Sequence, residues 1–323
     1  MNILVTGGAG YVGSTLTPLL LDAGHQVRVL DCLIYGGRSL LGVWSHPGFS
    51  FIRGDVCHKN MVQEALKGIQ AVVHLAAIVG DPACVKQPEK ARAINLEASL
   101  SLLEESKRMG VERFVFASTC SNYGKMSDPS CYVDETSQLR PISLYAETKV
   151  AVEKVLLDPA QTNSLCATSL RFATVFGVSP RMRFDLTVNE FTMEMITKQE
   201  LLVYGEQFWR PYIGVRDVAR AVAVVLSAPK EIVRSAVFNV GSTKQNYQKQ
   251  QLVEMVKPYA PKAVVKFVHK DEDPRDYRVS FAKIQEILGF ECQQSLENGI
   301  REIANLVRDG VIRDFDNPEY KNI

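Results

Sequence analysis

Residues 1–31 read MNILVTGGAGYVGSTLTPLLLDAGHQVRVLD, and this stretch decides the fold. The apolar run at 2–6 predicts a short buried strand, and helical periodicity at about 14–23 follows a glycine-rich turn. A second apolar strand is predicted at 27–30, and Asp31 closes it. This order of strand, glycine turn, helix, strand and acid is typical of a dinucleotide-binding α/β unit.

The turn carries Gly7, Gly10 and Gly13 at GxxGxxG spacing, with Tyr11 and Val12 between the last two. We expect Gly7 to allow the sharp turn and Gly10 to let backbone N–H groups approach a pyrophosphate. We expect Gly13 to let the helix pack closely on the strand. The helix N-terminus adds partial positive charge where phosphates would lie. A structural turn without a ligand is the alternative, and the flanking elements favour the dinucleotide.

The acid at the end of the second strand indicates which dinucleotide binds. The Asp31 carboxylate can accept hydrogen bonds from both hydroxyls of a ribose. It would also repel a 2′-phosphate. The expected cofactor is therefore NAD rather than NADP.

Apolar strands alternate with helical stretches along the rest of the chain. Further strands are predicted at 49–52, 71–75, 113–117, 169–172, 201–204, 212–215 and 264–268. Helices are predicted at 60–66, 91–109, 144–157, 187–198 and 216–227. This alternation predicts an α/β fold: a Rossmann-type doubly wound parallel sheet with a smaller, discontinuous α/β lobe that binds substrate. We assign 1–173 to the NAD-binding domain, with 212–241 returning to it, and 174–211 and 242–323 to the smaller lobe.

Composition limits the classes of function. The chain has 323 residues and a net charge of +1, so no overall field favours nucleic acid or an anionic membrane. Seven scattered cysteines without a CxxC pair argue against a disulfide framework and a metal site. The first strand follows no basic segment and apolar segment of the kind that signal peptides have, so we expect no signal peptide, and no apolar run reaches the ~18 residues of a membrane span. We expect a cytoplasmic protein.

The sequence YAETK places Tyr145 and Lys149 four residues apart on a predicted helix, and therefore on one face. A nearby ammonium and a positive nicotinamide would both lower the pKa of the phenol from its usual ~10. Tyr145 could then remove a proton from a sugar hydroxyl. Thr119, just after the strand at 113–117, is a candidate to position that hydroxyl. A surface Tyr–Lys pair is the alternative.

These motifs resemble those of extended short-chain dehydrogenases/reductases of the nucleotide-sugar epimerase/dehydratase family, over nearly the whole chain. The matching stretches are TGGAGYVG, GDV at 54–56, HLAA at 74–77, Asn95, STCSNYG, YAETK, RFATVFG and RPYIGVRDVARA. The resemblance implies that Lys149 holds the nicotinamide ribose and that Asn95 supports the active-site helix. It implies further cofactor contacts from Asp55, Val56, Leu75, Ala76, Ala77, Ser118 and Phe172. For Asp55, a simple loop cap is the alternative.

The resemblance also implies a substrate that carries a diphosphate, which arginine binds through its planar fork. Arg210 matches the family's phosphate-binding arginine, Arg275 matches a second one, and Arg278 competes with Arg275 for that role. Asn189 matches an amide that contacts the diphosphate. A solvated surface charge is the alternative for each arginine.

The stretch SPRMRFDLTVNEF is similar to one branch of the family, which includes GDP-heptose 4-dehydrogenases of bacterial surface-glycan pathways. By this similarity Arg181 and Arg183 would line the sugar or nucleotide pocket, although an Arg183–Asp185 ion pair is equally compatible. The similarity of HLAAIVGDPAC places two more residues, Gly80 and Asp81, near the sugar. Thr174 stands where most members have asparagine.

The family's 4,6-dehydratases carry an Asp-Glu pair after the residue that matches Thr119. This chain has Cys120 and Ser121 there, as candidate substrate contacts without that acid strength. We therefore expect oxidation at the sugar 4-hydroxyl, as a 4-epimerase or a 4-dehydrogenase, rather than dehydration. A 4-ketoreductase and a non-catalytic NAD-binding scaffold are the alternatives. The residues fix neither the nucleotide nor the sugar.

A homodimer is expected, because the family pairs the helices that match 91–109 and 144–157. Candidate contacts are Leu100, Leu103, Val152 and Leu156, which could equally face the protein's own sheet.

Overall fold

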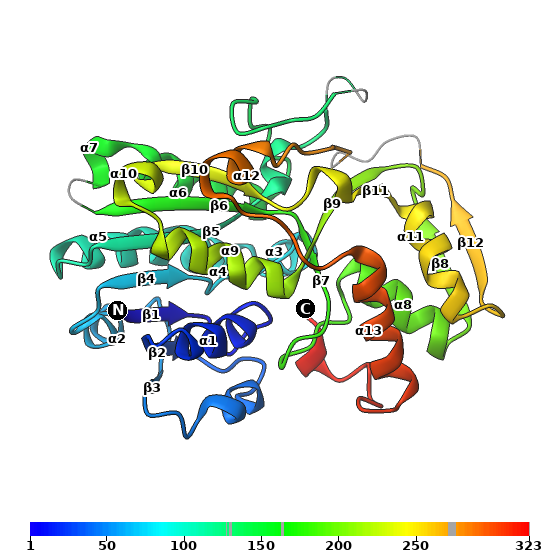
Figure 1. The fold of residues 1–323 in the computed structure, drawn as a ribbon, viewed down its shortest axis with the longest axis horizontal. Coiled ribbons are helices and arrows are strands. Elements are labelled where there is room, and N and C mark those ends of the chain that lie inside the picture. The colour runs from blue at the N-terminus through cyan, green and yellow to red at the C-terminus, as the bar shows by residue number, and fades with distance from the viewer. Residues whose placement is uncertain (127, 129–130, 163–164, 271–275, 323) are drawn as a thin grey trace.

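The computed structural model of the chain describes residues 1–323 apart from 127, 129–130, 163–164, 271–275 and 323. A parallel sheet of seven strands forms its centre, in the order β10-β6-β5-β4-β1-β2-β3 (Figure 1). The strands are β1 (Asn2–Thr6), β2 (Gln26–Asp31), β3 (Phe49–Arg53), β4 (Ala71–His74), β5 (Arg113–Thr119), β6 (Cys166–Phe172) and β10 (Ala236–Val240). The predicted Rossmann-type α/β fold is confirmed.

Both faces of this sheet are buried, which explains why its strands are nearly continuous apolar runs. Along β1, Ile3 and Val5 belong to one core and Leu4 to the other, since neighbouring side chains point to opposite faces. The first core is closed by α1 (Gly13–Asp22), α9 (Val215–Ser227) and α12 (Ala282–Leu288). The second is closed by α2 (Lys59–Leu66), α5 (Ser99–Arg108) and α6 (Leu144–Leu157).

The two edges of the sheet differ in what they carry. The turns that lead into β2, β4 and β5 hold Gly24, Gly68 and Gly110, all with positive φ. A Cβ added to any of these three glycines would meet nothing within 4 Å. At the carboxyl edge the parallel register instead gathers chemically functional side chains. Ligands of doubly wound sheets bind at this edge.

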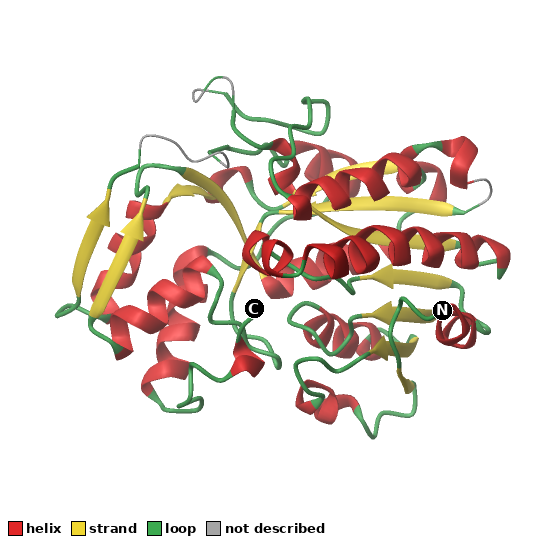
Figure 2. Ribbon diagram, turned by 180° about the vertical axis from the view of Figure 1, so that it is seen from behind, coloured by secondary structure: helices red, strands yellow, loops and turns green. Residues whose placement is uncertain are grey.

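A second group of elements lies beside the carboxyl edge (Figures 1 and 2). It contains a three-stranded sheet in the order β11-β9-β7 and a two-stranded parallel sheet of β12 and β8. The strands are β7 (Thr174–Phe176), β8 (Glu200–Tyr204), β9 (Trp209–Gly214), β11 (Asn246–Gln248) and β12 (Val264–Val268). Their core is shared with α8 (Thr187–Thr197), α11 (Lys249–Val256) and α13 (Leu296–Arg308). The division of the chain into two domains stays a prediction.

The helix predicted at 91–109 is interrupted. The chain forms α4 (Pro88–Arg92), then a π-helical segment at Ala93–Ala98, and then α5. Hydrophobic periodicity could not show this change, because the apolar spacing continues through it. The remaining α-helices among the described residues are short: α3 (Asp81–Lys86), α7 (Pro159–Thr162) and α10 (Lys230–Val233).

The leucines and valine named as candidate dimer contacts face inward. Leu103, Val152 and Leu156 are at most 1% exposed and belong to the core between α5, α6 and the sheet. Leu100 is partly buried against the same core. These side chains therefore stabilise the protein's own sheet, because they lie on the sheet-facing side of each helix.

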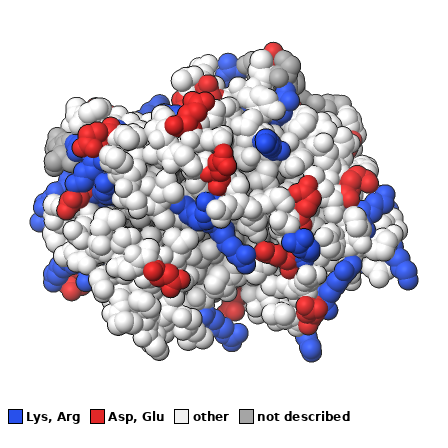
Figure 3. Space-filling view, viewed as in Figure 1, with Lys and Arg blue, Asp and Glu red and all other residues white. Residues whose placement is uncertain are grey.

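Charges of both signs are mixed across the face shown in Figure 3. Among the described residues, no helix is both long and apolar enough to cross a bilayer.

Candidate active site

The glycine turn after β1 lies directly against the segment that follows β4. Gly7 has φ +72°, and a Cβ there would lie 2.7 Å from the Ala76 nitrogen. The Ala76 N–H donates to the Thr6 Oγ1 at 3.3 Å. The structure thus brings together two cofactor motifs that lie about 70 residues apart, the glycine turn and HLAA. Any side chain at Gly7 would push them apart.

Helix α1 starts on the turn itself. A Cβ on Gly13 would lie 2.4 Å from the Gly7 carbonyl oxygen, so this glycine lets the helix pack on the turn, rather than on the strand as expected. Val12 precedes the helix, no side chain caps it, and its first turn holds no acid. The N–H groups of Ser14 and Thr15 already donate to the Gly10 and Val12 carbonyls, at 2.9 and 3.1 Å, but no side chain competes with an anion for the helix dipole. This end of α1 fits a dinucleotide phosphate.

Asp31 ends β2 beside the same turn. Its carboxylate accepts hydrogen bonds from the N–H of Ala9 at 2.9 Å and from the N–H of Leu33 at 2.8 Å. Burial raises the pKa of Asp31 above its ordinary value, while these N–H groups and the charge of Arg181 oppose that rise. The side chain is thus held in place and fits the predicted role at a ribose.

Tyr11 and Val56, two other predicted cofactor residues, have buried side chains, and Asp55 bonds to its own loop. The Tyr11 hydroxyl is buried and donates to the Gly177 carbonyl at 2.6 Å. Val56 is 6% exposed within the core between α2 and the sheet. Asp55 accepts from the Cys57 N–H at 2.9 Å and thus caps its own loop. At Tyr11 and Val56, only the backbone could contact a cofactor.

Asn95 fixes the segment after β4. Its side-chain oxygen accepts from the Ile78 N–H at 2.8 Å, and its side-chain nitrogen donates to the Ile78 carbonyl at 2.9 Å. The predicted support of the active-site helix is not what these bonds provide. They hold the loop that includes the partly buried Ala77 and leads to Gly80. Gly80 has φ +97°, which allows α3 to begin at Asp81.

Tyr145 and Lys149 share one face of α6, whose N-terminus is capped by Ser143. The Lys149 ammonium is 2% exposed and lies 4.7 Å from the centre of the Phe116 ring and 5.8 Å from that of Tyr145. Burial lowers the pKa of Lys149 to about 8. The two side chains are therefore neighbours at the carboxyl edge rather than a surface pair.

The pKa of Tyr145 departs from the expected direction. Burial raises the pKa of the phenol above its ordinary value, and nearby Cys84 and Asp81 add to the rise. The positive charge of Arg183 opposes it. Lys149 is not among the groups that shift this pKa, and burial, which disfavours the charged phenolate, is the largest cause of the rise. The Asp81 effect also places this carboxylate near the phenol.

Thr119 ends β5, beside Phe172 in the register of β6. Its hydroxyl accepts from the Ser121 N–H at 3.1 Å and so caps the turn that follows. Ser118 is buried and its hydroxyl accepts from the Asn122 side chain at 3.1 Å. Thr119 is only partly buried, and is thus the hydroxyl of this pair that solvent can reach.

The next two residues point in different directions. Cys120 is 1% exposed, and its thiol donates to the Arg171 carbonyl at 3.2 Å. This corrects the expectation that Cys120 contacts substrate: the residue begins a 3-10 turn at Cys120–Tyr123, and its side chain is turned into the core. Ser121 is partly buried, and its hydroxyl lies 3.4 Å from that of Tyr277.

The segment from Thr174 to Asn189 crosses between the two groups of elements. Thr174 pairs with Tyr212 at the start of β7. Arg183 forms an ion pair with Asp185 at 2.6 Å, as in the structural alternative. Asn189 is fully buried, with its oxygen bonded to the Gly177 N–H and its nitrogen to the Arg183 carbonyl. Its amide holds this loop instead of offering donors to a diphosphate, which corrects that expectation.

Arginines and aromatic rings gather at β9. Arg210 is 8% exposed and lies 5.6 Å from the centre of the Tyr277 ring, and it donates to the Trp209 carbonyl at 2.7 Å. Arg278 lies between the rings of Tyr132 and Trp209, at 4.8 and 5.0 Å. The two guanidinium groups share the Trp209–Tyr277 neighbourhood. Arg275 lies outside the described residues.

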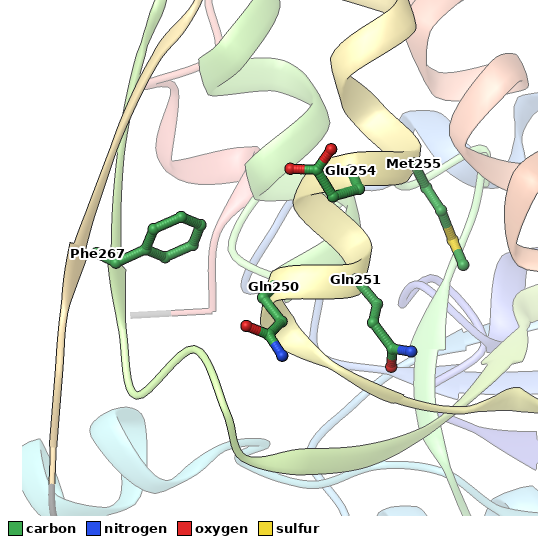
Figure 4. A pocket seen from close by; sticks show the side chains of 5 residues that line it. All are labelled: Gln250, Gln251, Glu254, Met255 and Phe267. Atoms are coloured by element: carbon green, nitrogen blue, oxygen red, sulfur yellow. The ribbon is translucent and has the colours of Figure 1, made fainter.

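Sequence reasoning missed Tyr277, whose hydroxyl faces Ser121 and whose ring meets Arg210. Its only signal was its place beside Arg278, which is weak. A surface hollow of about 560 Å³ lies between α11 and β12 (Figure 4). Its lining residues are Gln250, Gln251, Glu254, Met255 and Phe267. None of these residues belongs to the site described above, and the hollow offers no arginine for a phosphate.

Comparisons with known proteins agree with this geometry. The model of the "NAD dependent epimerase/dehydratase family" matches residues 3–241. A UDP-glucose 4-epimerase of Corynebacterium glutamicum is 29% identical over 90% of both chains. A dTDP-glucose 4,6-dehydratase of Streptomyces niveus is 29% identical over 96% of this chain and 93% of its own. The structure of Thermus thermophilus UDP-glucose 4-epimerase in complex with NAD superposes with a TM-score of 0.84 and 30% identity, covering 97% of this chain and 100% of that one.

Proposed function

Because the chain belongs to the NAD-dependent epimerase/dehydratase family, we propose that it uses NAD to oxidise the sugar 4-hydroxyl of a nucleotide-diphosphate sugar. The reaction would end as a 4-epimerase or a 4-dehydrogenase of surface-glycan or deoxysugar biosynthesis. The observation that carries this proposal is the pairing of Tyr145 with the buried Lys149 at the sheet edge that also holds the glycine turn.

Each side chain has a role that follows from its position. Tyr145 accepts the proton of the 4-hydroxyl, and Thr119 orients that hydroxyl through its solvent-accessible side chain. Lys149 contributes positive charge and binds the nicotinamide ribose. NAD bound at this site would supply the hydride acceptor and a further positive charge.

The charges around Tyr145 make formation of its phenolate depend on bound NAD. Burial raises the pKa of Tyr145, so its phenol is protonated at neutral pH when no further cation is near. Lys149, whose pKa is about 8, is mostly charged at pH 7. One ammonium does not offset the burial of the phenol. Added positive charge in this dry site would act strongly on the phenol, since charges interact more there than in water.

The diphosphate end of the substrate would lie at β9. Arg210 is buried beside Tyr277 and supplies a planar donor fork. Arg278 lies in the same group, so both arginines are retained as candidates, together with Arg275. Dehydration stays disfavoured, because Cys120 is turned into the core and Ser121 is not an acid.

The test is incubation of the purified protein with UDP-, GDP-, dTDP- and CDP-sugars, followed by NMR of the product. Inversion at C4 without net NADH formation identifies an epimerase. A released keto sugar with stoichiometric NADH identifies a dehydrogenase, and consumption of NADH with a 4-keto sugar identifies a ketoreductase. Binding of NAD without turnover of any of these sugars would contradict the proposal and indicate a non-catalytic scaffold.

We also propose a cytoplasmic homodimer that pairs α5 and α6 of two copies. The outward faces of these helices carry Glu104, Glu147, Ala151 and Lys154 rather than the leucines first considered. Light scattering on the purified protein tests this assembly. A monomer at micromolar concentration would contradict it.

A further inference from the structure

The segment 177–183 packs on the start of α1. The Ser179 hydroxyl donates to the Tyr11 carbonyl at 2.7 Å and lies 3.1 Å from that of Ser14. The Arg181 N–H donates to the same Ser14 hydroxyl at 3.3 Å. Arg181 therefore stands at the N-terminus of α1, which no side chain caps and where a dinucleotide phosphate would bind.

The guanidinium of Arg181 is buried without a counter-ion. It is 5% exposed and lies 4.1 Å from the centre of the Tyr35 ring. It donates to the Lys321 carbonyl at 3.2 Å, while its Nε is buried without a hydrogen-bond partner. Within the described part of the chain, no carboxylate comes within ion-pair distance of it. A buried cation in this state is unfavourable unless an anion joins it.

Nearby charges fit this interpretation. Asp31 and Arg181 influence each other's pKa, which places the arginine beside the acid predicted at the ribose. The Asp31 carboxylate is already engaged by two backbone N–H groups. Arg183 differs from Arg181, because Asp185 neutralises it. Of these two arginines, therefore, only Arg181 has no carboxylate counter-ion.

We propose that Arg181 binds the diphosphate of the dinucleotide cofactor, rather than the sugar substrate, an inference that rests on the proposed use of NAD. The helix N-terminus and the guanidinium would approach the same phosphates, one from each group of elements. This reassigns Arg181 from the sugar or nucleotide pocket expected from the sequence.

The C-terminal segment holds this arginine in place. The Tyr320 carbonyl accepts from the Phe184 N–H at 2.9 Å, and the Asn322 N–H donates to Asp185 at 3.0 Å. Figures 1 and 2 both show the end of the chain in the middle of the molecule, between α1 and α13. Residues 320–322 thus hold the loop that carries Arg181.

The test compares Arg181→Met with Arg301→Met, a control at an exposed arginine of α13. Calorimetry on cofactor-free, full-length protein measures the Kd for NAD, ADP-ribose, adenosine, UDP and GDP. In Arg181→Met we expect the Kd for NAD and ADP-ribose to rise about 10- to 100-fold, the range of one charge-assisted contact. The Kd for adenosine, UDP and GDP should not change. Arg301→Met should match the wild type for every ligand.

Unchanged affinity for NAD in a folded Arg181→Met variant would overturn the inference. Weaker UDP or GDP binding with normal NAD binding would instead return Arg181 to the sugar nucleotide. If this variant does not fold, Arg181→Lys decides the question: it keeps the charge but loses the fork, so NAD alone should bind several-fold more weakly. If the wild-type protein turns over a nucleotide-sugar but Arg181→Met or Arg181→Lys binds NAD normally, only this inference is refuted. Wild-type protein that does not bind NAD would refute the proposed function as well.

Discussion

Glu153, one helical turn beyond Lys149 on α6, forms a fully buried ion pair with Arg171 of β6. The Arg171 Nε donates to the carboxylate at 2.9 Å, and Ser169 donates to its other oxygen at 2.9 Å. Arg171 also donates to the Tyr123 hydroxyl at 2.9 Å. The helix that carries Tyr145 and Lys149 is thereby fixed to the sheet by charge as well as by apolar packing.

Glu153→Ala should destabilise the protein by about 3–5 kcal/mol, because it leaves Arg171 buried without a counter-charge. Urea unfolding measures this change. The double variant Glu153→Met/Arg171→Met should recover most of the lost stability, since it removes both charges and keeps the volume. A double variant as unstable as the single one would show that the carboxylate matters for some reason other than charge.

Tyr145→Phe should lower kcat by about 10²- to 10⁴-fold, the usual contribution of a positioned acid–base group. NAD should remain bound, because the ring and its packing are kept. Product NMR and cofactor content together measure the two effects. Tyr259→Phe, at a distant site beside α11, serves as the control and should retain activity. Normal turnover by Tyr145→Phe would remove the phenol from the mechanism.

Lys149→Met should abolish activity but stabilise the cofactor-free protein at pH 7. A fall in the pKa of Lys149 from 10.5 to about 8 corresponds to roughly 3 kcal/mol of unfavourable burial. The unfolded chain binds more protons than the folded one between these two values, so wild-type stability should rise with pH across that window. The variant should lose this rise, measured by urea unfolding at pH 7 and pH 9.5. Lys154→Met, at an exposed position on the same helix, should keep it.

His74 should make the protein sensitive to mild acid. Its ring bonds to Thr6 at 2.7 Å and to Ser99 at 2.9 Å, and burial lowers its pKa from 6.5 to about 3. The folded state keeps the ring neutral while the unfolded chain takes up a proton, so stability should fall by about 2 kcal/mol between pH 6.5 and pH 5. His74→Gln should flatten this part of the pH profile, whereas His58→Gln, at an exposed position, should not. An equally steep profile in both variants would exclude His74 as the cause.

The sequence predicted six of the seven strands of the central sheet, because they are apolar runs, and it missed β10. The bounds of β1, α6 and β12 were predicted to the residue, since apolar runs and helical spacing begin and end abruptly there. The strands β7 and β11 were missed, because three residues are too few to show alternation. The π-helical segment around Asn95 was missed, because its spacing imitates an α-helix.

The sequence predicted the parts of the candidate site in which a motif determines the backbone conformation. It predicted less well which hydrogen-bond partners the side chains have. Glycine spacing located the turn, and the four-residue spacing of Tyr145 and Lys149 located the helix face. Asn189 contacts Tyr11 and Cys120 contacts Arg171, residues far away in the chain, and no local sequence pattern reveals such contacts. The pKa of Tyr145 depends on how deeply it is buried, and sequence spacing does not measure depth.

The three glycine turns at the amino edge of the sheet are well suited to protein engineering. Gly24, Gly68 and Gly110 border open space, and they lie across the sheet from the glycine turn, Thr119 and Tyr145. These exposed turns are therefore suitable places for a fluorophore, a surface tether or a short inserted peptide, provided that each glycine itself is kept for its positive φ. The enzyme could then be immobilised or observed with its catalytic edge facing solution.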